Sequence, residues 1–501
     1  MSESRSSYRQ ILKSSSIIGG ASVVNIVVGL VRTKVLAVLL GPAGVGLAGL
    51  LTSIMGTAST VAGMGMCTSG VRQVAEAASR DDVARMVVVR RALWFATLVL
   101  GALGSLILWL MREPVAQGIF GTAEKSSAVG WLAFGVFFTV VGGSQGAMLQ
   151  GMRRIADMAS AGIIGSIVGT IMAVGCVLTW GVRGIVAYII VAPLSSFVIA
   201  ALFLRRIPRV DGIAPWSEVK GEIAPLLRLG AMLMLSGLMS TVTQLLVRTI
   251  INRELGMEAN GLFQAAWTIS MTYIGFVLGS MAADYYPRLT AAIHDKAQAN
   301  QLVNEQIHVA LLLAGPVLVG MLSLAPLVIN ILYAKAFSGA VDILRWQIIG
   351  DLFKIIAWPL GFIILASGAG KIYFLTETSW NVFYMGIVWS GIKTVGLVVT
   401  GMSFFLSYSM YLIICWFVAR RLIGFSFDKN NFHLVIKYIG IVSSVFVSGL
   451  FWPKLTMVLG SMLTVVLFIY SFNQLADMTG VKGPVAAIAR KTREFVGGRL
   501  R

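Results

Sequence analysis

The sequence predicts an all-α protein that crosses a membrane about fourteen times. Of its 501 residues, 57% are apolar and only 12% are charged, and the mean hydropathy is +0.85. A water-soluble domain of this size needs far more charge to cover its surface. The apolar runs are also continuous and about twice as long as the strands of a membrane β-barrel, so helices are expected.

Each expected helix is a run of roughly 20 or more mostly apolar residues, which is the length that spans the hydrocarbon core of a bilayer. The first run follows two arginines, as a signal peptide would, but it is too long and lacks a small-residue cleavage site, so we expect it to be retained. The expected spans are residues 14–40, 46–70, 86–110, 127–151, 156–181, 184–204, 224–251, 260–286, 305–332, 343–367, 372–399, 401–419, 434–452 and 455–472.

The distribution of Lys and Arg predicts the orientation, because basic residues in short loops stay on the cytoplasmic side. With the N-terminus inside, 28 of the 40 basic residues fall in cytoplasmic segments and only six in outside loops. Both termini are therefore expected in the cytoplasm. The formal net charge of +19 follows mostly from this asymmetry and from attraction to anionic lipid headgroups, so it does not indicate a nucleic-acid partner.

The chain also repeats itself. Leu-Val-Arg-Thr stands at residues 30–33 and again at 246–249, each time late in a long apolar run. Gly41 and Gly256 follow the two copies at nearly the same distance. Because both copies begin on the same side, the repeat predicts two parallel six-helix bundles that rock against each other around a binding cavity.

The expected bundles cover residues 1–210 and 211–424, separated by a charged linker. Residues 425–501 are expected to add a helix pair and a basic cytoplasmic tail. Within the tail, residues 484–496 have the spacing of a short basic amphipathic helix on the inner membrane face.

The sequence gives no support for metal, disulfide or nucleotide chemistry. Cys67, Cys176 and Cys415 lie in apolar runs without paired spacing, and the three histidines are scattered near cytoplasmic loops. The run Gly-Ala-Gly-Lys at residues 368–371 resembles the end of a phosphate loop, but Ile372 stands where that loop needs Ser or Thr. We therefore expect no cofactor, no metal and no ATPase activity. A transporter driven by an ion gradient or by the membrane potential, or running downhill, is expected rather than an enzyme.

Ionisable side chains within membrane spans are costly, and they usually line a cavity or face a partner. Arg32 follows Asn25 by seven residues, which gives the first helix a polar face, and Arg248 lies on a similar face in the second repeat. We predict that Asn25, Arg32, Lys34 and Arg248 line a substrate cavity, because the guanidinium fork of arginine suits phosphate. The alternative is that the three basic side chains extend to the outer interface.

The tenth expected span carries a second polar stripe. Its members are Gln347, Asp351, Lys354 and Trp358. Gln347, Lys354 and Trp358 are predicted to line the substrate cavity. Asp351 and Lys354 lie one turn apart, so they can neutralise each other, and a purely structural salt bridge is the alternative to a role in transport.

Three carboxyl groups are candidates for ion coupling, because such groups within membrane helices mark proton relays. Glu377 is the first choice, and Asp351 and Asp284 are the others. The alternative for Glu377 is a position at the inner lip of its span. Asp284 lies at an inner helix end, where capping or pairing is the alternative.

Two stretches resemble a known family. Residues 29–46 resemble the first helix of Wzx-type O-antigen flippases, in the polysaccharide branch of the multidrug/oligosaccharidyl-lipid/polysaccharide exporter superfamily. Residues 337–377, with the run Trp-Gln-x-x-Gly-Asp-x-x-Lys from Trp346 to Lys354, resemble the lipid III flippases of enterobacterial common antigen. Lys34 matches a lysine of that group, and Arg32 matches an arginine of the related lipid II flippases. The final helix pair departs from the lipid III group.

This resemblance implies a flippase that moves an undecaprenyl-pyrophosphate-linked oligosaccharide, an O-antigen or similar repeat unit, from the cytoplasmic to the periplasmic leaflet of a bacterial inner membrane. Its partners would be this substrate, membrane lipids and other glycan-assembly membrane proteins. Two alternatives stay open. A cation-coupled multidrug exporter of the same superfamily would more naturally place acidic residues in its cavity. A membrane glycan polymerase or ligase usually needs a larger catalytic loop than any expected here.

Overall fold

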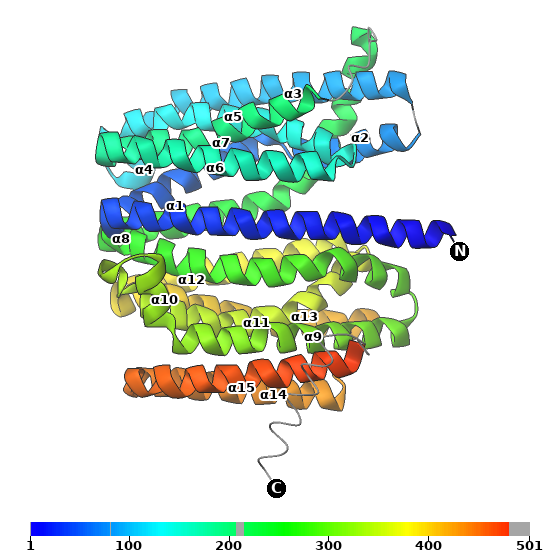
Figure 1. The fold of residues 1–501 in the computed structure, drawn as a ribbon. Helices are drawn as coiled ribbons and strands as arrows, with labels where there is room; N and C mark the ends of the chain where they lie inside the picture. Colours follow the sequence, from blue (N-terminus) through cyan, green and yellow to red (C-terminus); the bar gives the residue numbers. More distant parts are fainter. Residues whose placement is uncertain (1, 81, 207–214, 480–501) are drawn as a thin grey trace. The chain divides into compact units, whose positions relative to one another are not determined.

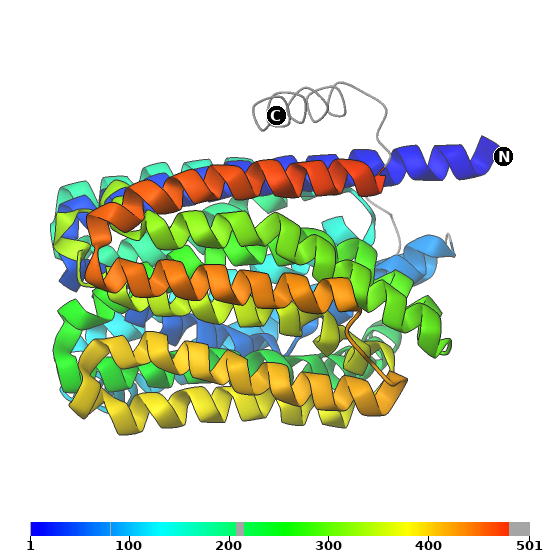
Figure 2. The same cartoon turned by 90° about the horizontal axis from the view of Figure 1, so that it is seen from below.

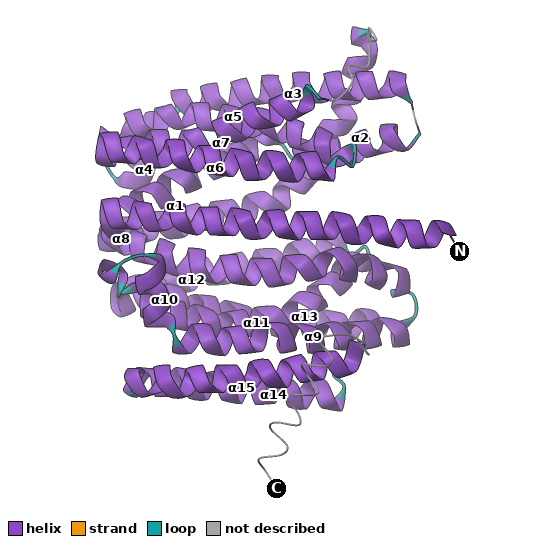
Figure 3. Cartoon of the chain, in the orientation of Figure 1, coloured by secondary structure: helices purple, strands orange, loops and turns teal. Residues whose placement is uncertain are grey.

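A computed structural model describes residues 2–80, 82–206 and 215–479. Within these ranges the chain forms α-helices and short 3-10 helices and no strand, which confirms the all-α prediction (Figure 3). The expected amphipathic helix at residues 484–496 lies outside the described residues.

The helices follow one another with short connections (Figure 1). In chain order they are α1 (Ser2–Gly63), α2 (Met66–Ser79), α3 (Val83–Leu110), α4 (Arg112–Phe120), α5 (Ser126–Gly151), α6 (Ile155–Trp180), α7 (Ile185–Leu204), α8 (Trp216–Ala292), α9 (Lys296–Ser323), α10 (Ala325–Leu332), α11 (Ala340–Ala366), α12 (Gly370–Val395), α13 (Val399–Ile423), α14 (Lys429–Phe451) and α15 (Pro453–Thr479). Four 3-10 turns connect them, at Ala123–Lys125, Gly181–Gly184, Lys335–Phe337 and Gly396–Val398.

Ten helical segments of the described chain are long and apolar enough to cross a membrane, so the protein is polytopic. Four of these segments are 43 to 54 residues long, and each overlaps two of the expected spans. Since roughly 20 residues suffice for one crossing, these four are long enough for two crossings each. The count of fourteen spans stays a prediction.

The chain divides into two compact units. The N-terminal unit comprises Met1–Gln264 together with Leu332–Ala336, and the C-terminal unit comprises Ala265–Ile331 and Phe337–Arg501. The first part of α8 therefore packs with α1 to α7. The functional bundle limits at residues 210 and 424 stay predictions.

The sequence repeat is visible as a repeated kink. Helix α1 is interrupted at Gly41, with φ 62° and ψ −170°, and α8 at Gly256, with φ 87° and ψ 178°. This backbone region is accessible essentially only to glycine. The two glycines that follow the Leu-Val-Arg-Thr copies therefore each allow a long helix to change direction.

Beyond the kinks, α1 and α8 approach each other so closely that their backbones touch. A Cβ atom added at Gly46 would overlap the carbonyl oxygen of Met257, and one added at Gly261 would overlap that of Pro42. In both cases the carbonyl group belongs to the residue just after a kink. Glycine at these two positions permits the backbone contact, as small residues do between membrane helices.

Replacing Gly261 by alanine is expected to destabilise the protein by about 3 kcal/mol, because a rigid backbone carbonyl occupies the space that the new methyl group needs. The thermal unfolding temperature in detergent and the yield of monodisperse protein would measure this effect. Gly275→Ala is the matched control, because no atom lies within 4 Å of a Cβ at that position of the same helix. Equal unfolding temperatures for the two variants would contradict the close approach.

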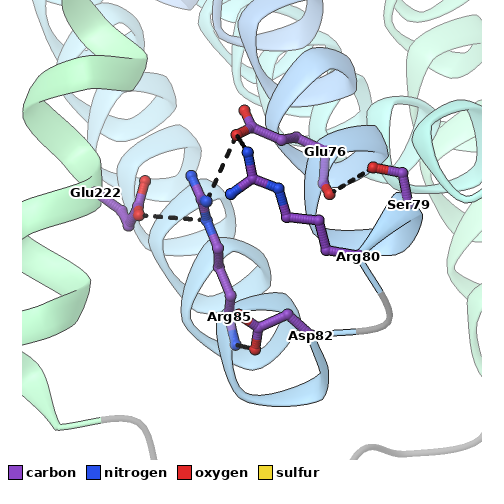
Figure 4. A network of polar contacts seen from close by, with 6 residues as sticks. All are labelled: Glu76, Ser79, Arg80, Asp82, Arg85 and Glu222. Atoms are coloured by element: carbon purple, nitrogen blue, oxygen red, sulfur yellow. Dashed lines mark hydrogen bonds and ion pairs between the residues drawn. The ribbon is translucent and has the colours of Figure 1, made fainter.

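A surface network fixes the start of α8 to the N-terminal unit (Figure 4). Arg85 of α3 lies 3.5 Å from the carboxylate of Glu76 in α2 and 3.8 Å from that of Glu222 in α8. Arg80 also pairs with Glu76, at 3.1 Å, and the side chain of Asp82 caps α3 by accepting from the Arg85 amide. Such exposed pairs contribute little individually, so the apolar contacts beneath them, including the buried Val219, carry most of the stability.

The last two helices, α14 and α15, pack against α9 within the C-terminal unit (Figure 2). A buried amide pair forms the polar part of this contact. The side-chain nitrogen of Asn431 donates to the backbone oxygen of Asn304 at 2.8 Å, and the Asn431 side-chain oxygen lies 2.7 Å from Nδ1 of His308. The Asp428 amide also donates to the Asn304 side chain, at 3.0 Å. Asn304 thus fixes both the start of α14 and the chain that leads into it.

Candidate functional site

In the N-terminal unit, Arg32 of α1 is the cation with the fewest protein partners among the predicted site residues. Its guanidinium carbon lies 5.8 Å from the centre of the Tyr188 ring of α7, a cation–π distance. Its side chain forms no hydrogen bond or ion pair with a described residue, and Nε is buried without a partner there. Asn25, two turns earlier on α1, likewise has a buried Oδ1 without a described partner. The polar face of α1 thus keeps unused hydrogen-bonding capacity.

The other two predicted cations of this unit are bound to protein groups. Lys34 donates to the backbone oxygen of Tyr333, which belongs to the short segment Leu332–Ala336 of the same unit. Arg248 is only 4% exposed and donates to the side-chain oxygen of Gln264. Its guanidinium carbon lies 5.2 Å from the centre of the Phe263 ring. The two arginines of the repeat therefore have different surroundings, and Arg248 lies beside the contact between α1 and α8.

In the C-terminal unit, Asp351 of α11 is fully buried, and one of its oxygens is strongly hydrogen-bonded. Oδ2 accepts from the hydroxyl of Ser270 at 2.7 Å and from that of Tyr273 at 2.5 Å, both on α8. Oδ1 is buried without a partner among the described residues. The direct salt bridge with Lys354 that the one-turn spacing permits is not formed, because no ion pair within 4.0 Å joins these two described residues.

Lys354 instead projects among aromatic rings. Its Nζ lies 5.3 Å from the centre of the Tyr408 ring and 6.0 Å from that of Phe404, both on α13. Its charge still acts on Asp351 and on Glu377, so the ammonium group is electrostatically shared between two carboxyl groups. Rings at these distances partly compensate the charge through cation–π attraction.

Glu377 of α12 is half-buried, and its Oε1 accepts from the hydroxyl of Tyr411 on α13 at 2.6 Å. Asp351 and Glu377 thus each accept a hydrogen bond from a tyrosine of a neighbouring helix. Asp351, Lys354 and Glu377, together with the tyrosines that surround them, are called the charged centre below.

An aromatic cluster packs around the charged centre. The rings of Trp380 and Tyr384 stack with centres 5.2 Å apart, and Trp380 also lies 5.0 Å from Tyr408. Sequence reasoning missed Phe404, Tyr408 and Tyr411, although their spacing of four and three residues places them on one face of α13. That spacing was the available signal.

Several buried polar atoms near the charged centre have no hydrogen-bond partner among the described residues. Gln347, one turn before Asp351, has 0% exposure, and neither its Oε1 nor its Nε2 bonds to a described residue. The Oδ1 of Asn381 and the hydroxyl of Ser407 are likewise buried and bond to no described residue. Buried polar groups in folded proteins are nearly always satisfied, so water, an ion or a ligand is needed to satisfy them here.

Two predicted residues do not join the charged centre. Trp358 stacks on Tyr285 of α8, with ring centres 6.1 Å apart and planes inclined by 29°. The side chain of Asp284 is 78% exposed and pairs with Arg288 at 3.1 Å, which is the pairing that its position at a helix end suggested.

Comparison with known proteins identifies the family of this chain. Residues 35–342 match the family described as polysaccharide biosynthesis protein. The chain belongs to this family. The match begins after Arg32 and ends before Asp351, Lys354 and Glu377, but it includes Arg248 and Tyr273.

Similarity to individual proteins extends further along the chain. The lipid III flippase of Escherichia coli (strain K12) is 24% identical over 413 residues, which are 81% of this chain and 97% of that protein. An inward-facing multidrug resistance MATE family transporter superposes with a TM-score of 0.69 at 17% identity, covering 80% of this chain and 94% of its own. The lipid II flippase MurJ in an inward closed conformation also gives 0.69, at 12% identity, covering 93% and 99%.

These likenesses confirm the predicted superfamily and its fold. They also confirm the prediction of a transporter rather than an enzyme, because the relatives are flippases and transporters. The roles of the individual site residues stay predictions.

Proposed function

We propose that the protein is a flippase that moves an undecaprenyl-pyrophosphate-linked oligosaccharide, an O-antigen or similar repeat unit, from the cytoplasmic to the periplasmic leaflet of a bacterial inner membrane. The observation that carries this proposal is the similarity to a lipid III flippase over 97% of that protein's length. The superfamily fold and the unpaired cation Arg32 support it. Both termini lie in the cytoplasm in this proposal, as the basic residues predict.

Arg32 is the proposed ligand of the pyrophosphate. A guanidinium group without a carboxylate partner can form two parallel charge-assisted hydrogen bonds to phosphate oxygens. Asn25 adds an amide on the same face of α1. Lys34 supplies a further charge once its hydrogen bond to a backbone carbonyl is exchanged for the ligand. Arg248, which is buried and bonded to Gln264, acts through its charge and not through direct contact.

The charged centre is the proposed coupling site, and an ion gradient is the proposed source of energy. When Asp351, Glu377 and Lys354 are all ionised, the charged centre carries a net charge of −1. A net charge among membrane helices is costly, so uptake of a proton or another monovalent cation is favoured there. The unsatisfied polar atoms of Gln347 and Asp351 provide further ligands for such a cation or for water.

Replacing Glu377 by glutamine is expected to remove the dependence of transport on the ion gradient while leaving downhill exchange intact. Glutamine keeps an oxygen that can accept from Tyr411, so the local packing survives and only the ionisable group is lost. Transport by proteoliposomes would be measured with and without an imposed proton or sodium gradient. We expect the gradient to stimulate the transport rate of the variant at least tenfold less than that of the wild type, which corresponds to about 1.4 kcal/mol. Glu305→Gln, an exposed carboxylate on α9, is the control. A wild-type gradient response in Glu377→Gln would exclude Glu377 as the coupling group.

Complementation tests the proposed substrate. Strains that each lack one defined flippase would receive this chain, and their surface glycans would be analysed. Restoration of one glycan supports the proposal and identifies the repeat unit. If no strain recovers and resistance to organic cations rises instead, the chain is a multidrug exporter. Longer glycans at unchanged flipping would indicate a polymerase.

A further inference from the structure

A basic pocket lies within the N-terminal unit, separate from Arg32 and from the charged centre. Its volume is about 540 Å³, and it is bounded by α3, α5 and the end of α7. The polar lining residues are Arg90 and Arg91 of α3, Ser144 and Gln145 of α5, and Arg205 after α7. No carboxylate lines the pocket.

The pocket lies at one end of its helices. Arg90 and Arg91 stand about two turns inside α3, roughly 10 Å from its first residue. Ser144 and Gln145 are about two turns before the end of α5, and Arg205 directly follows α7. These ends are predicted to be cytoplasmic, and α3 is apolar enough to cross the membrane from Ala84 onward. In the predicted orientation, the arginines stand near the level of the inner lipid headgroups.

Two of the three arginines that line this pocket, Arg90 and Arg205, have no partner among the described residues. Neither Arg90 nor Arg205 forms an ion pair or a side-chain hydrogen bond with a residue that the structure describes. Arg85, only five residues before Arg90 on the same helix, has two carboxylate partners (Figure 4). Trp94 also lines the pocket and is 53% exposed, and such rings are enriched at the level of the headgroups.

We propose that this pocket binds the headgroup of an anionic phospholipid from the inner leaflet, with the phosphodiester between Arg90 and Arg205. Its volume lies within the usual range of ligand sites, and basic pockets between membrane helices on the cytoplasmic side suit anionic headgroups. A lipid fits better than free phosphate, because most of the lining is apolar and Trp94 provides a surface for the glycerol and upper acyl chains. The lipid is a bound component and not the transported substrate.

Native mass spectrometry of the full-length protein in detergent tests this site. The protein would be titrated with phosphatidylglycerol and, separately, with phosphatidylcholine of the same chains. We expect tighter binding of phosphatidylglycerol to the wild type. Removal of one arginine near a membrane surface costs about a fivefold loss of affinity, so Arg90→Gln/Arg205→Gln is expected to weaken phosphatidylglycerol binding about 30-fold. Arg72→Gln, an exposed arginine of α2 that does not line the pocket, is the control and should bind like the wild type.

Each other outcome overturns the proposal. Equal weakening by Arg72→Gln, or none by the double variant, would show unspecific attraction to a basic surface. Titration with polyprenyl monophosphate and with inorganic phosphate distinguishes other sources of phosphate. Preferential binding of either one, lost in the double variant, would assign the pocket to the substrate lipid or to a free anion. A matching unfolding temperature for both variants ensures that lost binding does not reflect misfolding.

Discussion

Arg32→Ala is expected to abolish flipping while leaving expression and folding intact. The side chain makes no hydrogen bond to a described residue, so its removal leaves no protein group unsatisfied, whereas a pyrophosphate would lose two charge-assisted hydrogen bonds. At about 1.5–3 kcal/mol for each such bond, the loss in transport rate is at least about 100-fold. Export of the restored glycan in the complemented strain, and uptake of a fluorescent lipid-linked sugar by proteoliposomes, would measure it.

Two further variants distinguish binding from general charge. Arg32→Lys should also fail, because an ammonium group cannot reproduce the bidentate fork. Arg183→Ala removes an exposed arginine of the same unit and should transport normally. If Arg32→Ala exports glycan at the wild-type level, Arg32 is not a headgroup ligand, and its role is limited to the contact with Tyr188.

Lys354→Met is expected to be the most destabilising single change at the charged centre. Methionine fits the apolar and aromatic surroundings, but it removes the positive charge that acts on both Asp351 and Glu377. Loss of one member of a buried charged group typically costs about 3 kcal/mol, because the remaining charge is left uncompensated. The unfolding temperature of the purified protein in detergent should therefore fall by several degrees, and transport should be lost.

A double-mutant cycle makes this expectation specific. Asp351→Asn keeps an oxygen for the hydroxyls of Ser270 and Tyr273, so Lys354→Met/Asp351→Asn should recover much of the lost stability. Lys371→Met, an exposed lysine at the start of α12, is the control. Additive effects in the cycle would mean that Asp351 and Lys354 do not interact, and the charged centre would then not act as a unit.

The sequence showed the polar stripe of α11, but it did not show which groups bind Asp351 and Lys354. Spacing placed Asp351 and Lys354 one turn apart on α11 and suggested a mutual pair. In the structure Asp351 bonds to Tyr273, which lies 78 residues earlier in the chain, and Lys354 turns toward the rings of α13. A hydroxyl at 2.5 Å satisfies a carboxylate without the geometric demands of a salt bridge, and no local pattern reveals which distant helix supplies it.

The repeat also shows what the sequence determines and what it leaves to the tertiary structure. The sequence alone determined that Arg32 and Arg248 occupy corresponding places, and that a glycine follows each of them. Only the tertiary structure decided that Arg248 is buried and bonded to Gln264, beyond the Gly256 kink of its own helix, while Arg32 faces the ring of Tyr188 on α7. Corresponding residues in a repeat share their local sequence, but the fold of the chain decides their neighbours.

The sequence by itself determined the all-α class, the polytopic character, the internal repeat and the positions of charges within apolar runs. These are local properties, set by the length and period of apolar segments and by the conformational freedom of glycine at Gly41 and Gly256. The tertiary structure alone decided which charges are paired with a protein group and which, like Arg90 and Arg205, have no partner among the described residues. The physical reason is that a buried charge is satisfied by whatever group packing places within about 3 Å, and packing joins helices that lie far apart in the chain.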